Sequence, residues 1–271
     1  ENFMSNFEEK EAWFLEQSKS NFWKFKSSSS SAFYRDLFPV GTFEERVGKQ
    51  PCYEKTRKGN GFIVYTVGAD DKERKHTRMV FDDLNELYEL QENSCAFMSP
   101  ISYFGRNRTA KNARYLYALA FDLDDVGRKQ IDAFFGFHVY QKHYPRPTYV
   151  VNSGGGVHLY YVFKEPVPMI PKNQKALKIL KYELTTKVTN KKDIVIKSFG
   201  LELRPIEENV LNDVGGDDIH LLKITEKKLK RRRAIITRKY YDIYDLLLLD
   251  GLRLAAYLLK RYISNSIRRK S

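Results

Sequence analysis

The chain has 271 residues, of which 42% are hydrophobic and 14% aromatic, enough to bury a core as one large domain or two smaller ones. Its 47 Lys and Arg residues outnumber 34 Asp and Glu residues, and the net charge of +13 favours a polyanionic partner, most simply nucleic acid. The alternative on charge alone is a soluble basic protein without such a partner.

Cysteine content and hydropathy indicate the cellular compartment of the protein. Cys52 and Cys95 lie far apart in sequence and form no metal-binding spacing, which favours a reduced intracellular compartment. No signal peptide is visible, and the most apolar run, 246–259, is too short to span a bilayer. We therefore expect a cytoplasmic protein with no membrane partner.

The N-terminal region predicts a helix followed by an α/β unit. The first 26 residues carry seven aromatic residues at roughly helical spacing, and we expect this face to pack on the rest of the domain. The alternative is a functional aromatic platform. The serine run at 27–31 predicts a loop. Segments 47–54 and 62–67 are predicted to pair as strands, and 74–81 predicts a further strand.

A basic loop is predicted at 101–111, after a brief strand. It interleaves aromatic residues and glycine with the cations Arg106, Arg108 and Lys111. This mixture is typical of loops that contact a nucleotide or a DNA template, because cations bind phosphates and aromatic rings stack on bases. A solvated loop is the alternative.

An apolar strand predicted at 115–124 ends in two acids one residue apart. Residues i and i+2 of a strand share a face, so Asp122 and Asp124 are expected to point the same way, with Asp125 left as a spare or a helix cap. Two adjacent carboxylates repel each other unless a cation lies between them, and oxygen ligands suit Mg²⁺ or Mn²⁺. Solvated acids at the end of a strand are the alternative.

A glycine turn follows, between strands predicted at 148–152 and 157–163. Glycines permit close approach of backbone N–H groups to an anion. The hydroxyl of Ser153 and the imidazole of His158 would add donors to a phosphate. The predicted anion-binding residues are Ser153, Gly154, Gly155, Gly156 and His158. A divalent metal beside such a pocket indicates phosphoryl chemistry.

The rest of the sequence predicts a helix at 173–187 and short strands near 193–196 and 201–205. From Lys223 the sequence becomes strongly basic. Nine cations and one Glu lie between Lys223 and Lys239, centred on Lys230, Arg231, Arg232 and Arg233. This segment either binds the phosphate backbone of template DNA or is a solvated basic helix or linker. A leucine-rich helix is predicted at 244–263.

Two of these motifs resemble a known family. Phe121-Asp122-Leu-Asp124 and the run from Ser153 to His158 resemble motifs one and two of the archaeo-eukaryotic primase superfamily, also called primase-polymerases. More narrowly, the chain resembles the replication proteins of bacterial plasmids and integrated mobile elements. The resemblance covers about residues 33–205. It implies a metal on the two acids and contact of His158 with the phosphates of an incoming nucleotide.

The third motif of that family is an acid on a later strand, followed by an Arg-containing run. Asp193 with Leu203-Arg204-Pro205 is a partial match, although Ile206–Asn209 stands where Gly-Thr is expected. By this resemblance Asp193 completes the metal site, and Arg204 is suited to bind a triphosphate bidentately. The rival third acids are Asp213, Asp217 and Asp218.

The implied function is that of a DNA primase or primase-polymerase in replication of a plasmid or mobile element. It would join nucleotides from nucleoside triphosphates on single-stranded DNA with Mg²⁺ or Mn²⁺, and a replicative helicase is a further expected partner. The alternative is a non-catalytic initiator that binds origin DNA with a degenerate primase fold. A rolling-circle nicking enzyme would need His-x-His beside a Tyr nucleophile, and no His-x-His occurs.

The expected fold is α+β. It has a primase-type catalytic core with a mixed, mainly antiparallel sheet flanked by helices, an N-terminal α/β unit and a C-terminal basic helical tail. The expected divisions are an N-terminal helical segment at 1–32, the catalytic domain at 33–222 and the tail at 223–271.

Overall fold

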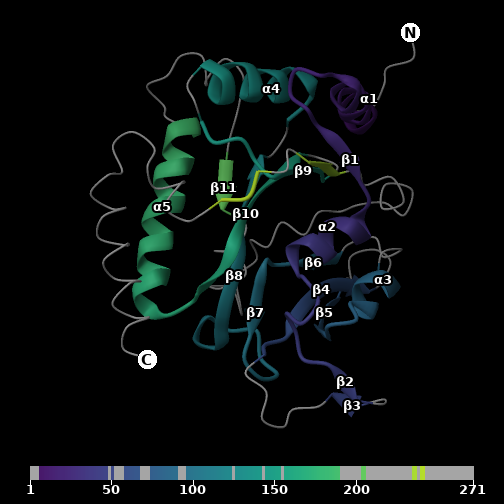
Figure 1. Ribbon diagram of the computed structural model, residues 1–271, viewed down its shortest axis with the longest axis vertical. Helices are drawn as coiled ribbons and strands as arrows, with labels where there is room; N and C mark the ends of the chain where they lie inside the picture. Colours follow the sequence, from purple (N-terminus) through teal and green to yellow (C-terminus); the bar gives the residue numbers. More distant parts are fainter. Residues whose placement is uncertain are drawn as a thin grey trace.

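A central antiparallel sheet with helices on both faces organises the chain, and a second sheet of three strands lies beside it (Figure 1). This arrangement confirms the expected α+β class and the mainly antiparallel sheet. The computed structural model describes residues 6–47, 50–51, 58–67, 74–90, 96–123, 126–141, 144–153, 156–189, 203–205, 234–236 and 239–241. Within them, no helix is both long and apolar enough to span a membrane.

Seven strands of the described residues form the central sheet. Six run in the order β1-β12-β9-β10-β8-β11, β7 also pairs with β8, and every pairing is antiparallel. The predicted hairpin around the glycine turn is present as β9 and β10. The strands are β1 (Lys26–Ser28), β7 (Ile101–Tyr103), β8 (Ala113–Leu123), β9 (Tyr149–Asn152), β10 (Val157–Pro168), β11 (Leu203–Pro205) and β12 (Ala234–Ile236).

Strands β8 and β10 form the middle of the sheet, and both of their faces are covered. Alternate residues point to opposite faces, so their continuous apolar runs supply two cores. One face, the helix face, carries Leu119, Phe121, Leu159 and Tyr161. The other, the α2 face, carries Ala118, Ala120, Tyr160 and Val162.

The helix face is covered by four helices from three parts of the chain. The bounds are α1 (Asn6–Lys19), α4 (Arg128–Ala133), the π-helical η2 (Phe134–Gln141) and α5 (Pro171–Thr189). The expected aromatic packing of the N-terminal helix is confirmed, since Trp13 and Phe14 are buried in this core. The Trp13 indole donates to Asp132 Oδ1 at 2.6 Å, which ties α1 to α4.

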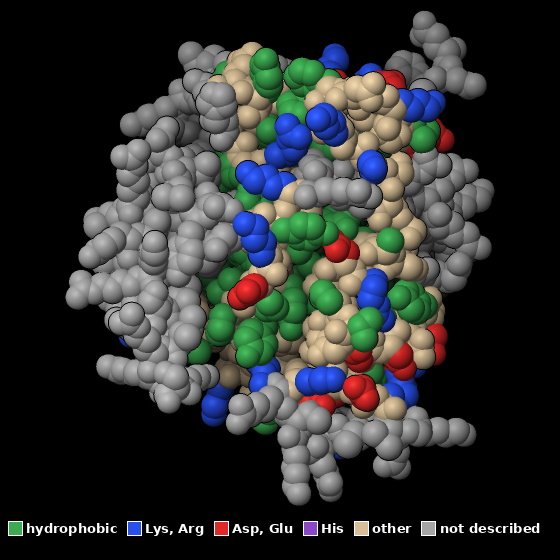
Figure 2. All heavy atoms as spheres, in the orientation of Figure 1, with side chains coloured by type: hydrophobic (Ala, Val, Ile, Leu, Met, Phe, Trp, Pro, Cys, Tyr) green, Lys and Arg blue, Asp and Glu red, His purple; other side chains and the backbone are tan. Residues whose placement is uncertain are grey.

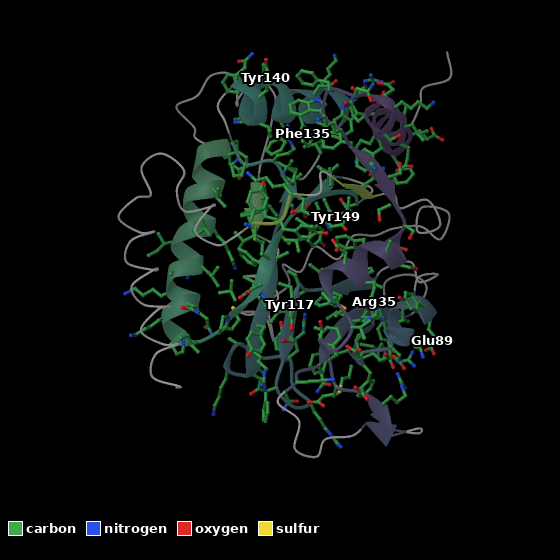
Figure 3. All side chains as sticks on the ribbon, in the orientation of Figure 1. Arg35, Glu89, Tyr117, Phe135, Tyr140 and Tyr149 are labelled. Carbon is green, nitrogen blue, oxygen red and sulfur yellow. The ribbon has the colours of Figure 1, made fainter. Side chains whose placement is uncertain are left out.

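The α2 face is covered by the N-terminal α/β unit. Phe33 of α2 packs edge-on against Tyr149 and Tyr160, with ring centroids 4.9 Å apart in both pairs. Figure 3 shows Tyr149 and Tyr117 on the side of the sheet where α2 lies. The elements are α2 (Ser30–Leu37), β2 (Arg46–Val47), β3 (Gln50–Pro51), β4 (Gly61–Val67), β5 (Arg74–Val80), α3 (Asn85–Glu89), β6 (Ala96–Met98) and the 3₁₀ turn η1 (Ala110–Asn112).

Two local predictions near the N-terminus are wrong. The serine run is not a loop: Ser27 and Ser28 belong to β1, and the Ser29 hydroxyl accepts from the Ala32 N–H at 3.1 Å as the N-cap of α2. Strand β4 does not pair with 47–54 but lies between β5 and β6. The strand at Lys26–Ser28 depends on pairing with β12, which is distant in sequence, whereas β4 pairs with the next strand along the chain, β5, and with β6.

The region expected to be a basic helical tail contributes a strand to the central sheet. Strand β12 lies between β1 and β9, so Ala234–Ile236 are strand and not helix. Just beyond it, Tyr241 N–H donates to Val162 O at 2.8 Å, and Lys164 N–H donates to Tyr241 O at 2.8 Å. The expected helix at 244–263 and the cluster Lys230–Arg233 lie outside the described residues.

Candidate active site

Three neighbouring strands place candidate residues in one row across the sheet. His158 of β10 lies opposite Asp122 of β8, and Arg204 of β11 lies opposite Asp122 on its other side. Directly opposed residues of antiparallel strands are about 4.5–5.5 Å apart at Cβ and share a face. The strand pairing therefore aligns residues from the three predicted motifs, which are 36 and 82 positions apart from Asp122 in sequence.

Asp122 and His158 meet on the α2 face near the end of β8. The His158 Nε2 atom lies 3.6 Å from Asp122 Oδ1, and the two side chains are 8% and 12% exposed. Ala118 and Ala120 are the preceding residues of β8 on this face, and Tyr160 follows His158 with ring centroids 6.3 Å apart. The carboxylate is thus held beside the imidazole and away from open solvent.

The glycine turn lies beside this pair. Ser153 N–H donates to Gly156 O at 3.2 Å and closes the turn. Ser153 is buried, and within the described part of the chain its Oγ has no hydrogen-bond partner. A buried hydroxyl without a partner costs free energy, so this donor is well suited to a ligand oxygen. Gly154 and Gly155 lie outside the described residues.

Helix α1 contacts the glycine turn from the helix face, which sequence reasoning did not find. Lys10 is fully buried, and its Nζ donates to Gly156 O at 3.0 Å. Asn152, the last residue of β9, donates to Glu11 Oε1 at 3.0 Å. A buried ammonium needs such a strong acceptor, so α1 positions both sides of the turn. A lysine in an N-terminal helix carries no sequence signal for this role.

The carboxylate and imidazole indicate what the row can bind. The Asp122 carboxylate offers oxygen donors to a divalent cation, and the His158 imidazole beside it can donate to an anion that the cation binds. Among the described residues there is no cluster of three or more His, Cys, Asp or Glu side chains that could hold a metal. The other two predicted ligands, Asp124 and Asp193, lie outside the described residues.

The basic loop predicted at 101–111 begins later than expected, because Ile101–Tyr103 form the buried strand β7. The loop, residues 104–112, lies far from this row. It precedes β8, and Asp122 is nine residues along that strand from Ala113, or about 30 Å at the usual rise per residue. Phe104, the first residue of the loop, is 60% exposed, and the Arg114 guanidinium lies 6.0 Å from the Phe104 ring. Arg106 and Lys111 are exposed, whereas burial lowers the pKa of Arg108.

Charge on the surface does not by itself locate a nucleic-acid interface. Figure 2 shows Lys and Arg side chains spread over the face in view, with Asp and Glu side chains among them. The positions of particular side chains, and not the overall charge, therefore identify such an interface.

Comparisons with known proteins give one structural likeness. No family model matches the chain, and no curated protein matches it. Among solved structures, the chain is similar to the AEP domain of the cyanophage S-2L primase-polymerase, with 13% identity and a TM-score of 0.43. The match covers 80% of this chain and 95% of that one. These values are too low to transfer an activity, so the function has to be inferred from the site.

Proposed function

We propose that this protein is a nucleotidyltransferase that extends or initiates DNA or RNA strands on a single-stranded DNA template, as a primase-polymerase does. The observation that carries the proposal is the row formed by Asp122, His158 and Arg204 on three adjacent strands, with the glycine turn next to it. An acid and an imidazole, with an arginine in register on the next strand and a buried hydroxyl that has no partner among the described residues, suit a triphosphate with its divalent cation.

Asp122, with Asp124 and Asp193, would hold Mg²⁺ or Mn²⁺, and Asp122 is the member of this set whose position beside His158 supports the assignment. When bound, the cations would neutralise the triphosphate and favour in-line attack by a 3′-hydroxyl, with pyrophosphate as the leaving group. The rest of the chemistry is positioning, which fixed side chains supply.

His158, Ser153 and Arg204 would bind the triphosphate. Pairing of β10 with β8 places His158 beside Asp122, so its Nε2–H can donate to a phosphate oxygen. Ser153 Oγ would donate to a second oxygen, and the N–H groups of the turn from Gly154 to Gly156 would contact others. Burial of Asp122, His158 and Ser153 limits access of water, which strengthens these contacts.

The template would be bound by cations of the basic loop and of the segment before β12. Arg106, Arg108 and Lys111 of the basic loop, and the cluster Lys230–Arg233, are the proposed contacts to its phosphates. By the resemblance of the motifs, the biological setting would be replication of a plasmid or mobile element, with a helicase as partner. The divisions 1–32, 33–222 and 223–271 stay a prediction, with β1 of the first and β12 of the last contributing strands to the central sheet.

Strand synthesis in solution tests the proposal. Purified protein is incubated with Mg²⁺ or Mn²⁺ and nucleoside triphosphates on single-stranded DNA, with and without an annealed primer. Product that requires the metal and is lost in Asp122→Asn supports the proposal. No product from folded protein, together with tight binding of duplex origin DNA, would instead support the non-catalytic initiator.

A further inference from the structure

A hollow of about 580 Å³ lies on the α2 face, away from the row that holds Asp122. It is bounded by the end of α2, by Tyr117 of β8 and by the last part of β10. Along the ladder, Val162 pairs with Ala118 four positions from the pair of His158 with Asp122. At the usual rise per residue, this places the hollow about 13 Å from the row on the same face.

The inner wall of the hollow is apolar and aromatic. Leu37 and Val162 are buried at its base, and Pro39 and Pro166 are exposed on its sides. Burial raises the pKa of Tyr117, so its hydroxyl stays neutral near pH 7. Flat apolar surfaces of this kind suit a planar, weakly polar group such as a nucleobase.

Hydrogen bonds between residues around the hollow fix its walls in the absence of a ligand. The Tyr240 hydroxyl donates to the Asp36 carboxylate at 2.7 Å, and the Tyr149 hydroxyl donates to the same group at 2.5 Å. The Thr148 hydroxyl donates to Lys239 O at 2.5 Å and fixes the chain where it enters the wall. The acidic group of the hollow is therefore engaged by two tyrosines.

Two exposed lysines, Lys164 and Lys239, lie in the lining. The Lys239 ammonium lies 4.9 Å from the centre of the ring of Tyr241, which is buried in the core of the helix face. The charged residues of the described lining are these two lysines and Asp36, whose carboxylate keeps its charge while the tyrosine hydroxyls donate to it. The hollow thus combines flat apolar walls with cations at the mouth.

We propose that this hollow binds one unstacked base of the single-stranded template, while Lys164 and Lys239 contact the phosphates on either side of it. The inference rests on the proposed function, since it places the template on the face that carries Asp122. The separation of about 13 Å along the face is one that a few nucleotides of single strand can span. The net charge of +13 favours such a polyanion over a neutral ligand.

Equilibrium binding of a fluorescent oligo-dT to the full chain tests the proposal, measured over a range of salt and without metal or triphosphate. Each lost phosphate contact lowers the salt slope by about 0.7 for single strands, so the double variant Lys164→Gln/Lys239→Gln is expected to lower it by about 1.4. The matched control is Lys175→Gln/Lys178→Gln, which removes two exposed lysines from α5 on the opposite face.

A second variant keeps the charge and fills the hollow. Pro39→Trp adds bulk at an exposed position of its wall and is expected to weaken oligo-dT binding several-fold with an unchanged salt slope. Wild-type affinity and slope in both the lysine and the Trp variants, with wild-type unfolding midpoints, would overturn the proposal. So would an equal loss in the α5 control, because the effect would then be one of overall charge.

Strand synthesis by the same variants separates this proposal from the proposed function. If the wild type makes product and the hollow variants bind oligo-dT normally, the hollow is refuted and the enzyme stands. If the hollow variants lose affinity but the wild type makes no product with either metal, the hollow stands as a site for single strands and the enzymatic proposal fails.

Discussion

Replacement of His158 by Ala tests the role of the row in nucleotide binding. The imidazole is 8% exposed and lies 3.6 Å from the Asp122 carboxylate, so it is positioned to donate to an anion bound beside that acid. Hydrogen bonds to charged groups contribute about 1.5–3 kcal/mol. The loss should therefore raise the Kd for a nucleoside triphosphate by about 10- to 150-fold.

The assay is calorimetric titration of the triphosphate in the presence of Mn²⁺, at a temperature well below the unfolding midpoint of the variant. His76→Ala is the matched control, because His76 is an exposed histidine of β5 in the N-terminal α/β unit. We expect this control to keep the wild-type Kd. A His158→Ala protein that is folded and binds the triphosphate with wild-type affinity would refute the proposed role.

Three further outcomes follow from the structure. Ser153→Ala should leave the unfolding midpoint unchanged or slightly higher, because the buried hydroxyl has no described partner, while triphosphate affinity falls about 10- to 150-fold; a lower midpoint with unchanged affinity would contradict this. Gly61→Ala should destabilise the protein to denaturant by about 1 kcal/mol, since the new Cβ would displace the flexible end of Met98 and lie 3.0 Å from Cζ of the buried Phe43 ring; wild-type stability would contradict it. Replacing the three cations of the basic loop by Gln should lower the salt slope for oligo-dT by about 2, and the distance of the loop from Asp122 predicts unchanged triphosphate affinity.

The parts of the site that the sequence predicts are local. An apolar run that ends at Asp122, and a glycine turn between two strands rich in β-formers, predict β8, β9 and β10 with nearly the observed bounds. The alternation of residues along those strands is enough to expect His158 and Asp122 on one face once the strands pair.

The parts that the sequence does not predict depend on distant contacts. Lys10 follows two acidic residues in a polar helix, a pattern that indicates a solvated side chain, yet it is buried against Gly156. Strand β12 has three apolar residues after a run of cations, too short to stand out from a basic tail. Its place in the sheet depends on pairing with β1, more than 200 residues earlier in the chain.

Binding of Mn²⁺ in the presence of a nucleoside triphosphate tests the central assignment most directly. Electron paramagnetic resonance counts free and bound Mn²⁺ without any need for catalysis, in the wild type and in Asp122→Asn. Loss of a residue that hydrogen-bonds to a metal ligand already lowers metal affinity by about 10- to 100-fold. Loss of the ligand itself should therefore weaken Mn²⁺ binding by at least about tenfold. Equal Mn²⁺ affinity in the two folded proteins would contradict the assignment of Asp122 as a metal ligand.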